Sequence, residues 1–495
     1  MSADLSPELI LGILIAYFSV LILIAYFTSK GSTTDDFFVA NKQSAWYLVA
    51  FGMIGASISG VTFISIPGAV GKAQFSYFQV VLGYVAGYVV IGTLLMPLYY
   101  RLNLVSIYSY LEQRFGFWSY KTGAFFFLLS RTIGAAFRIF LAVGVLQISI
   151  FDNFNIPFWL TAVISIFLIW VYTFRGGIKT IVWTDTLQTT FLLLAVVLSI
   201  LLIQQELGLS LGGLASTIWE SPYSKTFFWE DFNSPHFFFK QFFAGMFIAI
   251  AMTGLDQDLM QKNLTCKNIK EAQKNMFWFT VILVIVNLLF LSLGALLYLY
   301  AGAKGIAIPQ KTDDLYPILA LKYFSGWAGI VFFLGIIAST YASADSALAS
   351  LTTSFCIDFV GVSNKEEKER AFWVRWVHVG FSVLLVVVIL IFKVIQEQNP
   401  DSNVITSLFN AAGYTYGPLL GLYAFGLFTK YRVKDNWIPL VCVASPIFCY
   451  VLNLNSKEWL WGYQFGFEIL ILNGALTFVG MWFLRKKTDE TLFTN

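Results

Sequence analysis

Two short stretches of this 495-residue chain gather oxygen-bearing side chains inside long apolar segments. The first runs from Phe51 to Gly68 and contains glycines, serines, Thr62 and Pro67. A helix that unwinds there would free backbone carbonyls for a cation and hydroxyls for a ligand. The alternative is close helix packing through small residues. A plain lipid-facing helix gains nothing from such a run.

The second stretch runs from Ala338 to Ala347. Ser339, Ser343 and Ser346 share one helical face, because they are spaced by four and then three residues. Asp345 adds a carboxylate beside that face. Hydroxyl, carbonyl and carboxylate oxygens suit a hard cation such as sodium, and the run has no histidine or thiol for a transition metal. The alternative is a serine-rich packing seam in which a partner neutralises Asp345.

Further acidic side chains interrupt two other apolar segments. Asp185 is either an ordinary interfacial charge or a cation ligand on the route inwards. Asp256 and Gln257 follow Gly254. If the helix breaks there, these side chains line a cavity, and otherwise they cap the cytoplasmic end of the helix.

Arg131 and Arg138 lie two turns apart and therefore share one helical face. Two guanidinium groups inside an apolar segment require carboxylates, carbonyls or an anionic substrate. Both pairing with an internal acid and binding of a substrate carboxylate satisfy that requirement.

The elements that hold these residues are predicted to be membrane-spanning helices. The chain is 58% hydrophobic and 12% charged, against about 25% charged in soluble proteins. The apolar runs have the length of roughly 20 residues that a helix needs to cross a bilayer. We predict an all-α polytopic membrane protein with about 13 such segments, over residues 7–28, 45–69, 75–99, 119–149, 157–174, 183–204, 238–260, 275–301, 318–357, 374–395, 403–428, 436–453 and 459–484.

The distribution of Lys and Arg predicts an N-terminus outside and a C-terminus inside. The basic residues assigned to the cytoplasm include Lys262, Lys267, Lys270 and Lys274, and the terminal 485–487. The longest loop, about residues 205–237, is too short for an enzyme domain, and the chain has only two histidines. These features argue against an enzyme.

Five motifs, in this order and at these spacings, resemble the solute:sodium symporter family, which includes sodium–glucose, proline, pantothenate and sialic acid symporters. The resemblance extends from the first apolar segment to Lys430. The motifs are Ser59–Gly68, Gly176–Asp185, Gly254–Gln261, Ser343–Ser346 and Gly417–Gly426.

The resemblance implies the LeuT-like fold, with two inverted five-helix repeats whose first helices are broken. The repeats would cover 45–204 and 238–428 within one transporter domain, 1–495. An extra helix over 7–28 would precede them, and two more over 436–484 would follow.

The resemblance also implies a main sodium site and a second cation site, hence one or two sodium ions and no organic cofactor. The main site would use carbonyls of Gly55, Ile58 and Ser339 and side-chain oxygens at positions 342 and 343. Ser343 fits, whereas Ala342 lacks the expected hydroxyl. The second site would use Asp185, Asp345 and Ser346, and its two carboxylates would also allow a shared proton.

For the solute, the sugar symporters have Asn and Glu where this chain has Ser57 and Val61, which argues against glucose-type recognition. The pattern of Ser57, Ser59 and Thr62 is similar to the sialic acid branch, which uses an arginine on the helix of Arg131 and Arg138. The predicted solute pocket comprises Ser57, Ser59, Thr62, Tyr77, Gln79, Arg131, Arg138, Asp256, Gln257, Phe409 and Asn410.

The expected function is sodium-coupled import of a small polar solute, such as the carboxylate sialic acid, by alternating access. We expect a monomer in the lipid bilayer of a bacterial cytoplasmic membrane, with no nucleic-acid partner. Alternatives are a sodium/sugar or inositol symporter, a proton-coupled carrier in which Asp345 or Asp185 titrates, and a solute sensor or channel that does not accumulate its solute.

Overall fold

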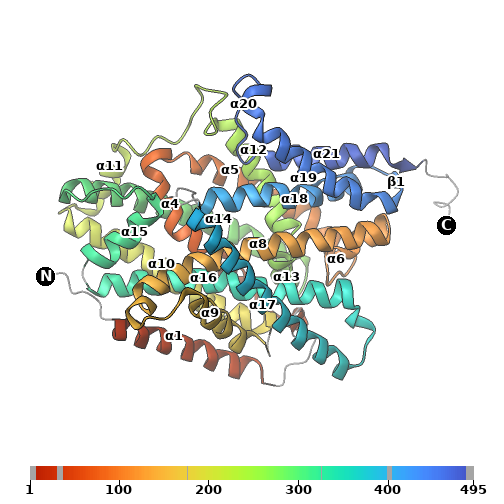
Figure 1. Cartoon of the computed structure of the whole chain (residues 1–495), viewed down its shortest axis with the longest axis horizontal. Coiled ribbons are helices and arrows are strands. Elements are labelled where there is room, and N and C mark those ends of the chain that lie inside the picture. The colour runs from red at the N-terminus through yellow and green to blue at the C-terminus, as the bar shows by residue number, and fades with distance from the viewer. Residues whose placement is uncertain are drawn as a thin grey trace.

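The computed structural model describes residues 7–30, 37–38, 40–174, 177–324, 326–398 and 404–486. Gly176 of one family motif and Lys487 of the predicted cytoplasmic tail lie outside these residues. Each of the thirteen predicted apolar segments contains a helix. Several long helices, such as α8 (Phe117–Ser149) and α16 (Gly326–Phe355), run roughly along the horizontal axis of Figure 1. Both oxygen-rich stretches are largely buried, the second of them within α16 itself.

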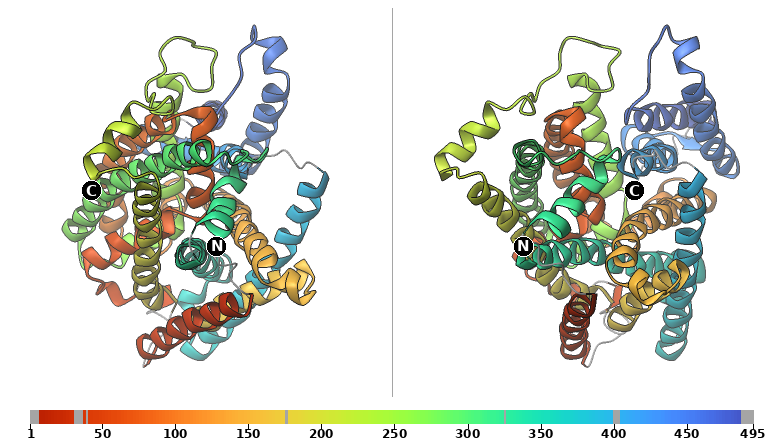
Figure 2. Two further views of the ribbon diagram at one scale, coloured as in Figure 1. Left: turned by 90° about the vertical axis from the view of Figure 1, so that its left-hand side faces the viewer. Right: turned by 60° about the vertical axis from the view of Figure 1, so that its left-hand side comes forward.

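The helices of the N-terminal half follow the predicted segments closely. Besides α8 they are α1 (Pro7–Thr28), α3 (Trp46–Ser57), α4 (Gly60–Ala73), α5 (Tyr77–Val90), α6 (Met96–Arg101), α7 (Ser109–Arg114), α9 (Phe158–Thr173) and α10 (Gly177–Glu206). A π-helical turn, η2 (Ile91–Leu95), joins α5 to α6. Figure 2 shows α1 at the edge of the bundle.

The C-terminal half contains α16 and a further set of helices. They are α11 (Leu211–Trp219), α12 (Phe238–Ala249), α13 (Gln257–Leu264), α14 (Ile269–Lys304), α15 (Leu315–Ile318), α17 (Glu367–Gln398), α18 (Val404–Phe428), α19 (Ile438–Leu454), α20 (Ser456–Trp459) and α21 (Ile469–Phe483). Two two-residue strands, β1 (Arg432–Val433) and β2 (Arg485–Lys486), pair antiparallel near the C-terminus.

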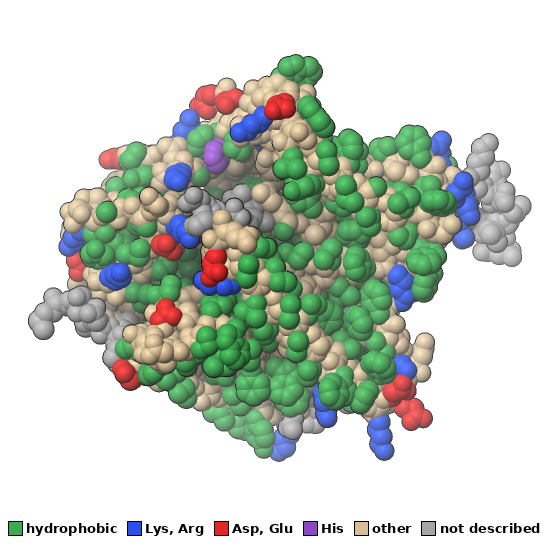
Figure 3. Space-filling view, in the orientation of Figure 1, with side chains coloured by type: hydrophobic (Ala, Val, Ile, Leu, Met, Phe, Trp, Pro, Cys, Tyr) green, Lys and Arg blue, Asp and Glu red, His purple; other side chains and the backbone are tan. Residues whose placement is uncertain are grey.

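The surface and the helix lengths are those of an integral membrane protein. In the described part of the chain, eight helices are long and apolar enough to cross a membrane, or ten if each bent pair counts as one. Large apolar side chains such as Ile15, Phe27 and Trp159 are exposed, and hydrophobic side chains cover much of the face in Figure 3. The orientation and the count of thirteen crossings remain predictions.

Two helices break where functional residues were predicted. The axes of α3 and α4 differ by 59° across Ile58 and Ser59. The axis of α12, with its π-helical extension η4 (Ile250–Gly254), and that of α13 differ by 63° across Leu255 and Asp256. Both breaks leave backbone groups outside the regular helical pattern, as cation or ligand sites in membranes require.

Close contact between α5 and α12 depends on glycine. A Cβ atom on Gly83 would lie 2.1 Å from the carbonyl oxygen of Phe242, and one on Gly245 would lie 2.2 Å from that of Val80. Since a larger side chain would push the backbones apart, these glycines hold α5 against the second broken helix.

Candidate functional site

The break between α3 and α4 lies directly against α16. A Cβ atom on Gly55 would lie 3.6 Å from the Cβ of Ala342, and one on Gly60 would lie 3.7 Å from the hydroxyl oxygen of Ser339. Ile58, at the break, is buried. The two oxygen-rich stretches found in the sequence therefore meet.

The oxygens at this junction come from uncharged groups. The Ser339 hydroxyl donates to the carbonyl of Ile336, and the Ser343 hydroxyl to that of Thr340, both at 2.9 Å. A hydroxyl that donates one hydrogen bond keeps lone pairs with which to coordinate a cation. Buried neutral oxygens beside a helix break suit a monovalent cation that must be released again.

Two threonines that were not predicted belong to the same junction. The Thr189 hydroxyl, on α10, accepts a hydrogen bond from the backbone N–H of Gly55 at 3.1 Å. The Thr340 hydroxyl is buried and has no hydrogen-bond partner within the described ranges. Thr340 lay inside the polar run and could have been found there, whereas Thr189 lies one turn beyond Asp185, outside the residues that marked that segment.

The three predicted ligands of the second cation site also lie in the interior, but each has a protein partner. The ammonium of Lys262 lies 2.5 Å from Asp185. Asp345 accepts hydrogen bonds from the Tyr172 hydroxyl, and the Ser346 hydroxyl donates to Asp258. Lys262, which was counted among the cytoplasmic loop residues, instead lies buried in α13, with only 1% of its side chain exposed.

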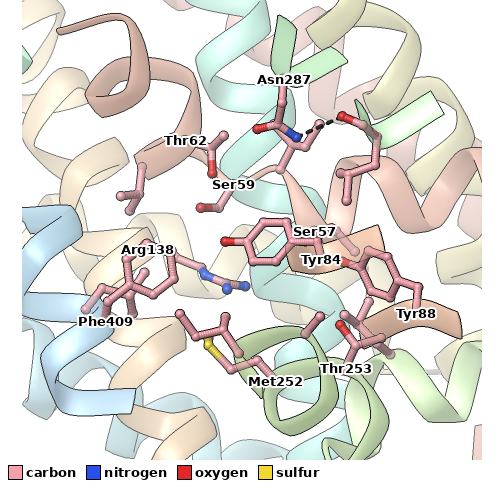
Figure 4. Close-up of a pocket in the computed structure, with 18 of the residues that line it drawn as sticks. Ser57, Ser59, Thr62, Tyr84, Tyr88, Arg138, Met252, Thr253, Asn287 and Phe409 are labelled. Carbon is pink, nitrogen blue, oxygen red and sulfur yellow. Dashed lines mark hydrogen bonds between the residues drawn. The ribbon is translucent and has the colours of Figure 1, made fainter. Parts of the chain in front are cut away.

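A partly open cavity lies beside the first helix break. Seven of the predicted solute-binding residues line it: Ser57, Ser59, Thr62, Tyr77, Arg131, Arg138 and Phe409. Figure 4 shows the guanidinium of Arg138 directed into this space, near Tyr84. The cavity is therefore bordered by hydroxyls, aromatic rings and two cations.

The two arginines differ in their partners. Arg131 forms an ion pair with Asp258, and both side chains are buried. Arg138 is only 7% exposed and has neither an ion-pair nor a hydrogen-bond partner among the residues described. A buried guanidinium without a partner is costly, so Arg138 is the group that gains most from an anion entering the cavity.

Four predicted pocket residues do not line the cavity: Gln79, Asp256, Gln257 and Asn410. The Gln79 amide donates to the carbonyl of His236 at 3.0 Å and accepts from the N–H of Phe228 at 3.1 Å, so it braces the loop before α12.

Burial lowers the pKa of His236 in that loop, which keeps the ring neutral at pH 7.

The second helix break uses Asp256 and Gln257 structurally. The Asp256 carboxylate accepts from the N–H of Asp258 at 2.8 Å and from the hydroxyl of Tyr416. Gln257 bonds the backbone of Val105 and Ile107 at 2.7 and 3.0 Å. The helix therefore breaks, as one of the two predicted alternatives required. The two side chains do not line the cavity, however, but anchor the break and the loop 102–108.

Several residues of the cavity wall were missed because they lie in stretches that carry no polar pattern. Tyr84 and Tyr88 come from α5, Met252 and Thr253 from η4, and Asn287 from α14. Met252 carries no signal, and the others are isolated polar or aromatic residues within apolar helices, which are common in membrane proteins and cannot be assigned without the fold.

Comparison with known proteins identifies the family. A family model described as the sodium:solute symporter family matches residues 37–435. This chain belongs to that family. This protein is therefore a sodium-coupled solute transporter. The family match confirms the prediction that it is not an enzyme.

The relatives of this symporter include two sodium/sialic acid symporters. One, from Aliivibrio fischeri, is 26% identical over 482 residues, covering 94% of this chain and 92% of the relative. The other, from Proteus mirabilis, is 24% identical over 440 residues, covering 85% and 84%. A solved structure described as the substrate-bound outward-open state of a Na⁺-coupled sialic acid symporter has a TM-score of 0.81 and 19% identity, covering 96% of this chain and 98% of that one. That likeness shows the fold.

Proposed function

We propose that this symporter imports a carboxylate-bearing solute of the sialic acid type together with sodium. The observation that carries the proposal is Arg138, a buried guanidinium without a protein partner that points into a cavity lined by hydroxyls. A guanidinium binds a carboxylate through two parallel hydrogen bonds. Ser57, Ser59 and Thr62 then face the hydroxyl and amide groups of the sugar. The two relatives named as sialic acid symporters support this choice of solute.

Sodium binds at the junction of Gly55, Ile58, Ser339 and Ser343 in this proposal. The same broken helix contributes Ser57 and Ser59 to the cavity wall. Sodium that holds α3 and α4 against α16 therefore also fixes the solute-binding serines. Coupling follows when sodium and solute both favour the outward-open state, because each then raises the affinity for the other.

The proposed architecture is a LeuT-like inverted repeat over 45–204 and 238–428, with thirteen crossings, the N-terminus outside and the C-terminus inside. The two helix breaks, one near the start of each repeat, support it. We further propose a monomer in a bacterial cytoplasmic membrane, because the two sialic acid relatives come from bacteria.

Uptake into proteoliposomes tests the proposal. Radiolabelled sialic acid, a monocarboxylate, glucose and inositol are compared with external sodium or potassium at fixed pH. Sialic acid accumulation that requires sodium is expected. Accumulation driven equally well by a proton gradient in potassium, accumulation of glucose or inositol alone, or binding without accumulation would each replace the proposal with one of its alternatives.

The variant Arg138→Gln isolates the role of the guanidinium. Loss of two charge-assisted hydrogen bonds of about 1.5 kcal/mol each predicts a drop of about 100-fold in kcat/KM for sialic acid. Arg138→Lys keeps the charge without the fork and should recover part of this loss. Arg101→Gln, at an exposed arginine on α6, is the matched control and should transport normally. Normal transport by Arg138→Gln would show that the carboxylate binds elsewhere.

A further inference from the structure

Three charged side chains from three helices meet in the interior below the sodium junction. Asp185 lies on α10, Lys262 on α13 and Asp345 on α16, and each is at most 1% exposed. The Lys262 ammonium lies 2.5 Å from Asp185 Oδ2. Asp345 interacts electrostatically with both of the other groups. The cluster thus places one fixed cation in an ion pair with Asp185 and within electrostatic reach of the second carboxylate, Asp345.

These carboxylates are the ones that would otherwise bind a second sodium ion. Protein groups already bind three of their four oxygens: Lys262 pairs with Asp185 Oδ2, and Asp345 accepts from the Tyr172 hydroxyl at 2.9 Å and from the N–H of Ser346 at 2.5 Å. The Ser346 hydroxyl donates to Asp258, which also pairs with Arg131. The fourth oxygen, Asp185 Oδ1, is buried without a hydrogen-bond partner in the described part of the chain, but a sodium ion bound there would lie next to the Lys262 ammonium, whose like charge opposes binding.

The fold delivers Lys262 to this position through the second helix break. The bend of 63° after η4 turns α13 into the interior, and every residue from Gln257 to Leu264 is buried. Tyr100 restrains the end of this segment, because its hydroxyl donates to the carbonyls of Asn263 and Cys266, at 2.8 and 3.1 Å. The ammonium is therefore held by the backbone and cannot diffuse away as an ion would.

We propose that the ammonium of Lys262 is a resident cation at the second cation position, so that each transport cycle carries one sodium ion with the solute. The inference rests on the proposed sodium-coupled import and adds its stoichiometry. Lysine serves here as a compact point charge with three donors, which is the closest side-chain equivalent of a small monovalent cation.

The inference has an electrical consequence. One sodium ion and one singly charged carboxylate solute together carry no net charge across the membrane. A second sodium ion would add one charge, which at 100 mV corresponds to about 50-fold greater accumulation. In the wild-type symporter, solute accumulation should therefore not depend on the membrane potential.

Two measurements on the wild-type protein test this. Sodium-22 bound at saturation to the purified protein in detergent should reach one ion per chain, a result that needs no solute. In proteoliposomes, the ratio of sodium-22 to sialic acid taken up should be one, and an inside-negative potential set with valinomycin and potassium should leave uptake unchanged. Two bound ions, or a ratio of two with uptake raised by the potential, would overturn the inference. Absence of any sodium-driven sialic acid uptake would count against the proposed function alone, since the binding count still decides the inference.

A double variant, Lys262→Met with Asp345→Ser, should open the second site. It removes the ammonium and leaves the Asp185 carboxylate facing hydroxyls at positions 345 and 346. We expect two sodium ions bound per chain and uptake stimulated by an inside-negative potential. Lys267→Gln, at the exposed lysine five residues along, should keep the wild-type count of one. A folded double variant that still binds a single ion would also contradict the inference, and the wild-type counts decide if that variant does not fold.

Discussion

Two neighbouring turns of α16 offer a cation very different surroundings. Around Ser339 and Ser343 the oxygens are all uncharged, and they face the break between α3 and α4. Around Asp345, a few residues further on, the ammonium of Lys262 forms an ion pair with Asp185 and interacts electrostatically with Asp345. In the proposed mechanism, the first environment binds sodium weakly enough to release it, whereas in the second the cation is the Lys262 ammonium, which is covalently part of the protein. We infer that the transported ion binds where the surrounding oxygens are uncharged, and that the resident ammonium lies where they belong to carboxylates.

The largest expected effect comes from breaking the charged cluster. Lys262→Met leaves two buried carboxylates without their cation, which should lower the free energy of unfolding by about 3–5 kcal/mol. Adding Asp185→Asn removes one of these carboxylates, so the double variant should be more stable than Lys262→Met alone. Melting temperatures in detergent measure both effects.

Lys267→Met provides the control for this prediction, because it removes a lysine that is exposed. Its melting temperature should stay close to that of the wild type. Equal melting temperatures for Lys262→Met and Lys267→Met would mean that the ion pair contributes little to stability.

The next largest effect concerns the neutral junction. Ser343→Ala removes one ligand oxygen, worth about 2 kcal/mol for a charge-assisted contact, and should raise the sodium concentration for half-maximal uptake about 30-fold. Stability in potassium should change little, because only a hydroxyl is lost. Ser350→Ala is a close control, since the Ser350 hydroxyl makes the same type of bond to a carbonyl three residues earlier, at 2.9 Å. Sodium dependence that is identical in the two variants would exclude Ser343 as a ligand.

The neutral junction could be predicted from the sequence and the charged cluster only in part. Ser339 and Ser343 stand out because polar residues inside apolar segments are rare and costly, whereas the roles of Gly55 and Ile58 were implied only by the family resemblance. Asp185 and Asp345 stand out for the same reason. Both breaks fall in the motifs that the family resemblance supplied. The helix-forming segments follow from apolar length, and each contains a helix in the structure.

Lys262 shows what such an argument cannot supply. It follows an apolar segment and precedes several other lysines, a pattern typical of a cytoplasmic loop. Only the bend at Leu255 and Asp256 turns the chain back into the protein. The same limit applies to Arg131 and Arg138, which are equivalent in the sequence and differ only because Asp258 lies within reach of one of them.

A smaller effect is expected from Thr189→Val, which tests whether the junction depends on support from α10. The substitution conserves volume and leaves the N–H of Gly55 without the Thr189 hydroxyl, at a cost of about 1 kcal/mol in stability and roughly a fivefold loss of apparent sodium affinity. Thr190→Val, at the exposed neighbour, should affect neither quantity. If melting and sodium titrations do not distinguish the two variants, the hydrogen bond to Gly55 does not position the junction.

The smallest effect, and the only gain, is predicted at Ala342. Its Cβ lies beside Gly55, on the face of α16 that carries Ser339 and Ser343, so Ala342→Ser would add one more neutral oxygen to the junction. An added ligand of about 0.5–1 kcal/mol should lower the sodium concentration for half-maximal uptake by about two- to fivefold. Ala349→Ser, two turns along the same helix and equally buried, places a hydroxyl away from the junction and should not change sodium dependence. Because the Lys262 cluster is untouched, the number of sodium ions per solute should stay at one while the affinity rises. An unchanged or weaker sodium affinity in Ala342→Ser, with Ala349→Ser behaving as the wild type, would place the sodium ion away from position 342. The uncharged junction would then not be the site of the transported ion.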